Sequence, residues 1–256
     1  MATMDSMKMN RLVRNSGPIL FVFAGVLAVP VAAVAQGVDF SGTVRAGIAK
    51  SDNIYLAPSP DETDETTYVI SPTLELGYEN QRVGASLSYQ YDWFRYSDLG
   101  EKTEYHRYDA RFDSVLVPDA LYLDLGASRS QSIVNPDAII PPGGLPITNN
   151  LTDRDNYFFS PRLEKTLGRS ITVLLDYRYE DIRYDASDLE APEQIQDNVN
   201  QTANFKLENY KRGQGLTWAA MYEWRETEYD RSLPWEYKRA SGELGFWLSG
   251  STRVFA

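Results

Sequence analysis

The chain has 256 residues, with 17 Tyr, 5 Trp, no Cys and a formal net charge of −11 at pH 7. The lack of cysteine excludes disulfide bonds and thiolate zinc sites, and the acidic balance lacks the basic footprint that a nucleic-acid partner needs. We therefore expect no nucleic-acid partner, and no motif indicates a cofactor or metal. Beyond the N-terminus, no apolar run is long enough for a membrane helix.

The N-terminal segment predicts the compartment. A stretch rich in Lys and Arg at residues 8–14 precedes the apolar run from Ile19 to Ala35, which ends in the small-residue pattern Ala-Val-Ala. This order is typical of a secretory signal peptide, so we predict a signal peptide over residues 1–35 with cleavage before Gln36. A retained membrane anchor is the alternative, although the apolar run is short for a spanning helix.

Residues 36–256 follow as one predicted domain, in which apolar and polar residues alternate along the chain. The clearest stretches begin at Tyr68, Val83, Ile171 and Leu216. Alternation with a period of two predicts β-strands. We count about ten such segments of roughly ten to fifteen residues, whereas globular strands have about five or six residues and membrane-spanning strands need roughly nine to eleven.

The connections between these segments predict how the strands are arranged. Short connections lie at residues 79–82, 117–119, 167–170, 210–215 and 249–252. Long ones lie between them, at residues 51–66, 97–103, 132–152, 185–198 and 230–235. Short turns on one side and long polar loops on the other are typical of outer-membrane barrels. We therefore predict an all-β fold, an antiparallel up-and-down transmembrane β-barrel in the outer membrane of a Gram-negative bacterium.

An aromatic pattern recurs three times where a strand would meet a long loop. The copies are YQYDWFRYSD from Tyr89, YRYEDIRYDASD from Tyr177 and YEWRETEYDRS from Tyr222. Tyr and Trp favour the layer between hydrocarbon and headgroups, because the ring is apolar and its tip is polar. We predict an aromatic girdle that comprises Tyr89, Tyr91, Tyr177, Tyr179, Tyr222 and Trp224.

The positions of opposite parity are predicted to face a water-filled lumen. Along residues 105–117, for example, the odd positions from Arg107 to Asp113 are charged, whereas the even positions are mostly apolar. The predicted lumen-facing residues are Glu75, Asp92, Arg107, Asp109, Arg111, Asp113, Asp124, Asp176, Arg178, Glu223 and Arg225. Because carboxylates outnumber guanidinium groups in this set, an open pore would prefer cations modestly.

Two prolines interrupt the strand pattern at related places. Pro72 lies in SPTLE and Pro161 in SPRLE, at nearly the spacing that separates Tyr89 from Tyr177. This common spacing indicates duplication of a four-strand unit. Proline removes a backbone donor from the inside of a strand, so we expect a β-bulge at each of the two sites.

The run SDNIYLAPSPDETDETTYVISPTLELGYENQRVGASLSYQYDWFRYSD, followed by YHRYDARFD, resembles the type 2 β-barrel porins of Gram-negative bacteria. Within that group the chain is similar to outer-membrane proteins associated with exopolysaccharide and PEP-CTERM loci, best over Gly42 to about Ser132. The resemblance implies a porin-like barrel that serves exopolysaccharide export. It also implies its partners: outer-membrane lipid, lipopolysaccharide, the barrel-assembly machinery, and exopolysaccharide or its export apparatus.

Members of that family generally run longer than this chain. The segment GFWLSGSTRVFA from Gly245 begins a further strand just after a short turn, and a single-chain barrel needs an even number of strands. We interpret the chain as the N-terminal part of a larger barrel. A small closed barrel of about ten strands is the alternative.

The candidate chemical groups do not indicate an enzyme. His106 is the only histidine, and its parity places it among the apolar positions, so we expect an interfacial ring and not the base that acyl transfer needs. The acidic residues Asp61, Glu62, Asp64 and Glu65 could hold Ca²⁺, but they lack the glycine-spaced pattern of a dedicated calcium loop. A solvated acidic loop is the favoured interpretation.

Two functions therefore stay open from the sequence. One is a conducting or export barrel, and the other is a structural or adhesive barrel whose external loops bind a partner. The girth of the barrel distinguishes them, since a narrow interior is filled by its own side chains. The loop at 132–152 is rich in Ile, Leu, Pro and Gly, so it either folds inward and constricts the lumen or packs over neighbouring loops.

Overall fold

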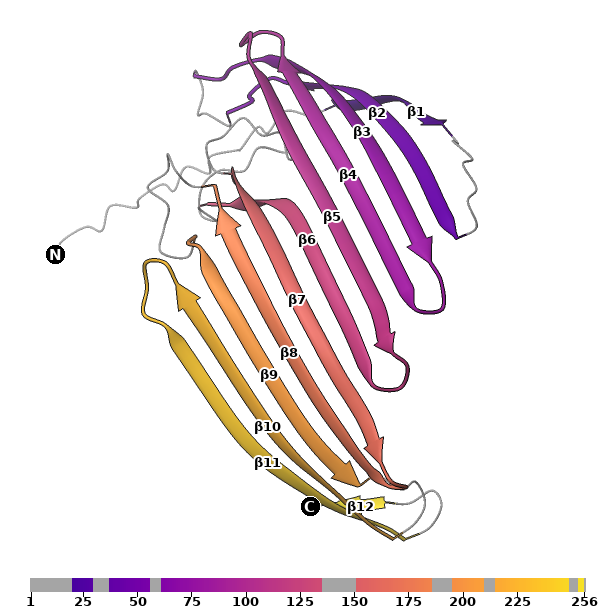
Figure 1. Cartoon of the computed structure of the whole chain (residues 1–256). Coiled ribbons are helices and arrows are strands. Elements are labelled where there is room, and N and C mark those ends of the chain that lie inside the picture. Colours follow the sequence, from indigo (N-terminus) through magenta and orange to yellow (C-terminus); the bar gives the residue numbers. More distant parts are fainter. Residues whose placement is uncertain are drawn as a thin grey trace, which may run out of the picture.

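The computed structural model describes residues 20–29, 37–55, 61–134, 151–185, 195–209, 215–248 and 253–255, which form one antiparallel sheet. The strands are β1 (Leu20–Val29), β2 (Val38–Ser51), β3 (Glu65–Glu79), β4 (Val83–Tyr96), β5 (Lys102–Val117), β6 (Leu121–Ile133), β7 (Leu151–Leu167), β8 (Ile171–Tyr184), β9 (Asn198–Asn209), β10 (Gly215–Tyr229), β11 (Trp235–Trp247) and β12 (Arg253–Phe255). Each strand pairs with its neighbours in the chain, so the sheet has no crossover (Figure 1). The predicted all-β, antiparallel, up-and-down arrangement is confirmed.

The sheet is open in the part of the chain that the structure describes. The strand order begins at β1 and ends at β12, and no pairing joins these two edges. Figure 1 shows the strands running side by side while the sheet twists from β1 to β11. The structure therefore shows an open up-and-down meander, and closure into a barrel remains a prediction.

The strands from β2 to β11 are long. The shortest is β9 with 12 residues and the longest is β7 with 17 residues. Even β9 is about twice as long as the usual globular strand of about five or six residues. β1 lies inside the predicted signal peptide and pairs with β2 from Gly42 to Lys50. Cleavage before Gln36 stays a prediction, and it would leave β2 at the edge of the sheet.

The connections follow the predicted alternation only in part. The turns at residues 80–82, 118–120 and 168–170 lie at one end of the sheet, and the connections at 52–64, 134–150 and 185–197 lie at the other. The two remaining connections at the loop end, residues 97–101 and 230–234, are as short as the turn at 210–214. We call the two ends of the sheet the turn end and the loop end.

The predicted β-bulges at the two prolines are wrong. Pairing of β3 with β4 lapses at Ser71 and Pro72 and resumes at Thr73, which opposes Gln90, with the register unchanged. Pairing of β7 with β8 lapses in the same way around Pro161. A missing N–H opens the ladder locally without adding a residue to the strand, so the register survives. The register shifts lie instead within β1–β2 and beside the β5–β6 turn.

Successive strands are staggered. Phe40, near the turn end of β2, directly opposes Leu76 of β3. Following the direct pairs from strand to strand leads through Ala110 in β5 and Asp181 in β8 to Glu228, at the loop end of β10. Such a stagger tilts the strands, which is the geometry that closing a sheet into a barrel requires.

Candidate functional site: the two faces of the sheet

The register divides the side chains between two faces. Residues that directly oppose each other project to the same face, and neighbours in a strand project to opposite faces. All the predicted lumen-facing residues fall on one face, which we call the polar face: Glu75, Asp92, Arg107, Asp109, Arg111, Asp113, Asp124, Asp176, Arg178, Glu223 and Arg225. The predicted girdle residues Tyr89, Tyr91, Tyr177, Tyr179, Tyr222 and Trp224 all lie on the other, which we call the apolar face.

The apolar face is unusually exposed. Many of its large side chains are exposed, among them Leu74 at 48% and Leu216 and Leu244 at 59%, and others such as Tyr89 and Phe112 are half-buried. On the polar face, by contrast, Tyr96 is 1% exposed. A soluble sheet buries its apolar face against a second layer, but no second layer covers this one within the described residues.

The apolar face ends in charged residues at the loop end of several strands. On β4 the apolar positions run from Val83 to Trp93, and Arg95 follows. On β8 they run from Ile171 to Tyr179, and Asp181 follows. These apolar stretches match the roughly nine to eleven residues of a membrane-spanning strand.

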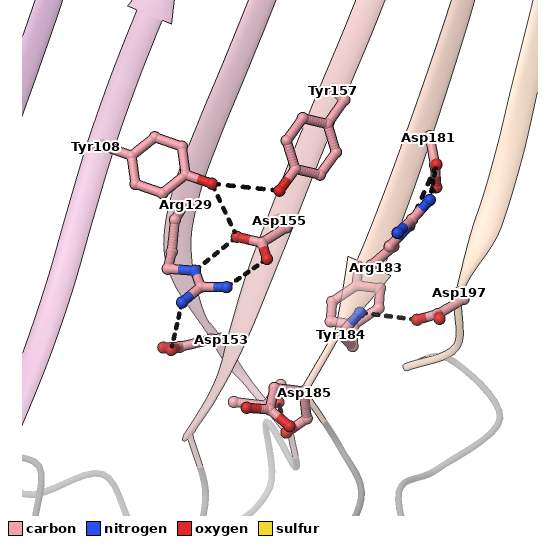
Figure 2. Close-up of polar contacts among 11 residues, drawn as sticks. Tyr108, Arg129, Asp153, Asp155, Tyr157, Asp181, Arg183, Tyr184, Asp185 and Asp197 are labelled. Carbon is pink, nitrogen blue, oxygen red and sulfur yellow. Dashed lines mark hydrogen bonds and ion pairs between the residues drawn. The ribbon is translucent and has the colours of Figure 1, made fainter.

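A cross-strand ion pair lies in this boundary region (Figure 2). Arg129 of β6 donates from Nε and Nη2 to the two carboxylate oxygens of Asp155 of β7, at 2.6 and 2.5 Å. Asp153 lies 3.9 Å from the same guanidinium group. The hydroxyl of Tyr108 lies 3.4 Å from Asp155 and 3.4 Å from the hydroxyl of Tyr157. We call these five residues the boundary cluster.

The boundary cluster was not predicted from the sequence. Arg129 and Asp155 break the apolar parity of their strands, at matching distances from the connection at 134–150. The sequence did contain a signal for this pair. Two residues of opposite charge replace apolar residues at matching distances from the connection, and such residues oppose each other in a hairpin. Asp181 and Arg183 of β8 add a second ion pair of 2.7 Å beside the cluster (Figure 2).

Most of the predicted lumen-facing residues form ion pairs. Asp92 is buried and accepts hydrogen bonds from Arg107 at 2.5 Å and from Gln90 at 2.8 Å. Arg111 lies 3.0 Å from Asp109, and Arg178 lies 3.3 Å from Glu180. Arg225 pairs with Glu223 in the same way.

Four of the predicted carboxylates have no ion-pair partner among the described residues, namely Glu75, Asp113, Asp124 and Asp176. Glu75 accepts a hydrogen bond from Ser41 at 2.9 Å, and Asp113 directly opposes Asp124. The unpaired charge of the predicted set is therefore acidic.

A ring on the polar face covers a glycine. A Cβ atom on Gly126 would lie only 2.1 Å from the ring of Phe158, which directly opposes Gly126 across β6 and β7. The guanidinium group of Arg178 lies 4.1 Å from the centre of the same ring, within the range of a cation–π contact. Glycine at 126 is thus needed for the position of Phe158.

The remaining candidate groups of the sequence are His106 and the acidic residues at 61–65. His106 lies on the apolar face, where Nδ1 is 2.7 Å from the hydroxyl of Tyr89. Asp61, Glu62 and Asp64 are exposed, but Glu65 is buried, so the expectation of a solvated loop is wrong for Glu65. Within the described ranges, no three His, Cys, Asp or Glu side chains come together as metal ligands.

Part of the predicted constriction lies outside the described residues. Residues 135–150 of the apolar loop fall there, as do residues 1–19 and 30–36 of the predicted leader and its cleavage site. In the part of the chain that the structure describes, no helix is long and apolar enough to cross a membrane.

Comparisons with protein-family models, curated proteins and solved structures found no match to this chain.

Proposed function

We propose that this chain is an outer-membrane β-barrel protein whose apolar face contacts lipid and whose polar face lines a water-filled pore. The proposal gives the chain a porin-like role in a Gram-negative outer membrane. The single observation that carries it is the exposure of the two faces. Large apolar side chains are exposed along one face, whereas the other face carries the charged side chains and buries Asp92, Phe94 and Tyr96.

The free energy of hydration explains why this arrangement favours lipid. Apolar surface left in water costs roughly 25 cal/mol per Å², and soluble monomers rarely expose contiguous apolar patches beyond a few hundred Å². The apolar face extends from Phe40 in β2 to Phe246 in β11. Contact with hydrocarbon removes this cost, and the charged boundary at the loop end would then lie among the headgroups.

Closure of the barrel is part of the proposal. Unpaired backbone N–H and C=O groups cannot be left in hydrocarbon, so a membrane sheet has to close on itself. The stagger from Phe40 to Glu228 already supplies the tilt that closure needs. We infer that both edges of the sheet are paired in the membrane.

The resemblance of the stretch from Gly42 to about Ser132 to porin-like proteins of exopolysaccharide loci supports a polysaccharide as the solute. Lipopolysaccharide, outer-membrane lipid and the barrel-assembly machinery are the proposed partners. Passage of a polysaccharide would use the polar face, where carboxylates, guanidinium groups and amides offer hydrogen bonds to hydroxyl groups.

A structural or adhesive barrel is the second candidate, and the fixed loops favour it. Gln196 donates to the hydroxyl of Ser232 at 2.7 Å, and Arg231 donates to the carbonyl of Ile195 at 2.6 Å. These bonds tie the connection between β8 and β9 to the connection between β10 and β11. Ordered loops can present a fixed binding surface, because less entropy is lost when a partner binds.

Cysteine labelling tests the proposed function. The chain has no Cys, so Asp109→Cys, Arg111→Cys, Ala110→Cys and Phe112→Cys each give one thiol. In intact outer membranes, a small water-soluble thiol reagent should label positions 109 and 111 and spare positions 110 and 112. Discrete conductance steps in a planar bilayer should accompany this pattern. Equal labelling of both parities would contradict the membrane barrel, and the parity pattern without conductance would favour the structural barrel.

A further inference from the structure

A small apolar cluster covers the polar face at the loop end of β2 to β5. Ile54, in the connection that follows β2, is only 2% exposed and packs with Ala49, Phe94 and Tyr96. These three strand residues all lie on the polar face. We call these four residues the mouth cluster. The chain after β2 therefore turns over the polar face instead of continuing away from it.

The described part of this connection is held in a defined shape. The backbone N–H of Ile54 donates to the carbonyl oxygen of Thr63 at 2.9 Å. The backbone N–H of Asn53 donates to the hydroxyl of Ser51 at 3.2 Å. Both ends of the connection are thus fixed near the mouth cluster, and Tyr55, next to Ile54, is 42% exposed.

A buried carboxylate fastens the neighbouring connection to this one. Glu65, the first residue of β3, is 1% exposed. Its two oxygens accept the backbone N–H groups of Asp98 and Leu99, at 3.1 and 2.9 Å. In return, the carboxylate of Asp98 accepts the backbone N–H of Thr66 at 3.2 Å. Burying a carboxylate is costly unless its oxygens are hydrogen-bonded, so these bonds hold the two connections together.

The side chain of Leu99 completes the link, because it packs against the mouth cluster. Glu65 therefore joins the start of β3 to the backbone of Leu99. Ile54 packs in the same cluster and covers the strand residues beneath it. The polar face is elsewhere lined by charged residues such as Asp109 and Arg111. An apolar cap on this face has no role in contact with lipid.

We propose that residues 52–55 form a fixed constriction at the loop-end mouth of the pore, held in place by Glu65. This inference rests on the proposed pore. The mouth cluster narrows the entrance of the pore on the side of β2 to β5. The hydrogen bonds from Glu65 to the 97–101 connection hold this constriction in place. The constriction involves the described residues 51–55 and 61–65, together with β3, β4 and the connection that follows β4.

The experiment uses the full chain in outer membranes and in planar bilayers. Glu65→Gln keeps the size of the side chain but removes one strong acceptor. Glu62→Gln makes the same charge change at an exposed position of the connection between β2 and β3. Each is combined with Ile54→Cys, and Tyr55→Cys provides the reference for an accessible thiol. The readouts are the rate of labelling by a water-soluble thiol reagent and the size of the single-channel conductance step.

With wild-type Glu65, Ile54→Cys should label far more slowly than Tyr55→Cys. Glu65→Gln should raise the labelling rate of Ile54→Cys toward that reference and enlarge the conductance step, whereas Glu62→Gln should change neither. Fast labelling of Ile54→Cys with Glu65 intact would overturn the proposal. If Glu65→Gln raises the labelling rate of Ile54→Cys but leaves the conductance step unchanged, the proposed constriction is wrong, while the proposed pore still stands. Slow labelling without any conductance would overturn the pore, and the constriction with it.

Discussion

Arg129 and Asp155 form a two-bond ion pair across β6 and β7, at 2.6 and 2.5 Å, on the apolar face of the sheet. Charged, two-bond contacts of this kind are among the stronger hydrogen bonds in proteins. Their side chains are 33% and 16% exposed, so solvent screens the pair only in part. The pair marks the level at which the apolar band of β6 and β7 ends.

The first prediction concerns this pair. Asp155→Asn should lower the free energy of unfolding by about 1 kcal/mol, because Arg129 keeps its charge and loses its partner in a partly screened site. A double-mutant cycle with Arg129→Gln, measured by urea unfolding in lipid vesicles, should show coupling between the two residues. The same cycle on Arg111 and Asp109, whose side chains are 68% and 49% exposed, is the control and should show almost none. Equal coupling in both cycles would contradict the prediction.

The second prediction concerns the contact between Gly126 and Phe158. Gly126→Ala should destabilise the sheet, because the new methyl group would overlap the Phe158 ring and push it from its place beside Arg178. Overpacking of this kind typically costs about 1–3 kcal/mol. Gly77→Ala is the matched control on the same face, since its Cβ would meet nothing closer than 3.7 Å. Urea midpoints that shift equally for both variants would show that the ring contact is unimportant.

The third prediction concerns the unpaired carboxylates of the polar face. If the pore is open, the reversal potential in a salt gradient should show a modest cation preference, because Asp113 and Asp124 oppose each other without an ion-pair partner among the described residues. Asp113→Asn should weaken this preference. Glu228→Gln removes the same charge from the apolar face and should leave it unchanged. Anion preference in the wild type would refute the prediction.

Residue parity is what the sequence could establish. Alternation along single strands placed Asp109 and Asp176 on one face, and Tyr89 and Tyr222 on the other, because a side chain's face depends only on its position in the strand. Loops between the strands do not affect this property. The same argument holds for every residue of the predicted lumen and girdle sets.

Contacts between distant segments could not be derived in this way. The buried position of Glu65 depends on the backbone of Asp98 and Leu99 in another connection, and an acidic run suggests only solvation. Pro72 causes no bulge because the hydrogen-bond ladder between β3 and β4 keeps its register although one backbone N–H is missing. Closure depends on how the edges of the whole sheet meet, which no local pattern specifies.

The final prediction tests the orientation of the two faces on β5. Phe112 lies on the apolar face between Ala85 and Leu125, and Asp113 lies next to it on the polar face. If the apolar face contacts lipid, as we propose, Phe112→Arg would place a charge among lipid tails and should cost roughly 2–4 kcal/mol near mid-membrane, enough to impair assembly into the outer membrane. Asp113→Arg introduces the same side chain one residue away, where water and Asp124 can solvate it, and should assemble normally.

The comparison separates a membrane barrel from a soluble sheet. In a soluble sheet with a second layer over the apolar face, Phe112→Arg would also impair folding, but the protein would remain in the soluble fraction of the periplasm. In a membrane barrel, Phe112→Arg should reduce the heat-modifiable, folded form in outer-membrane fractions, and Asp113→Arg should keep it. Asp109→Asn should keep it as well, because that change stays on the polar face. Loss of assembly in all three variants would contradict the proposed contact between the apolar face and lipid, since only Phe112→Arg would place a charge against lipid.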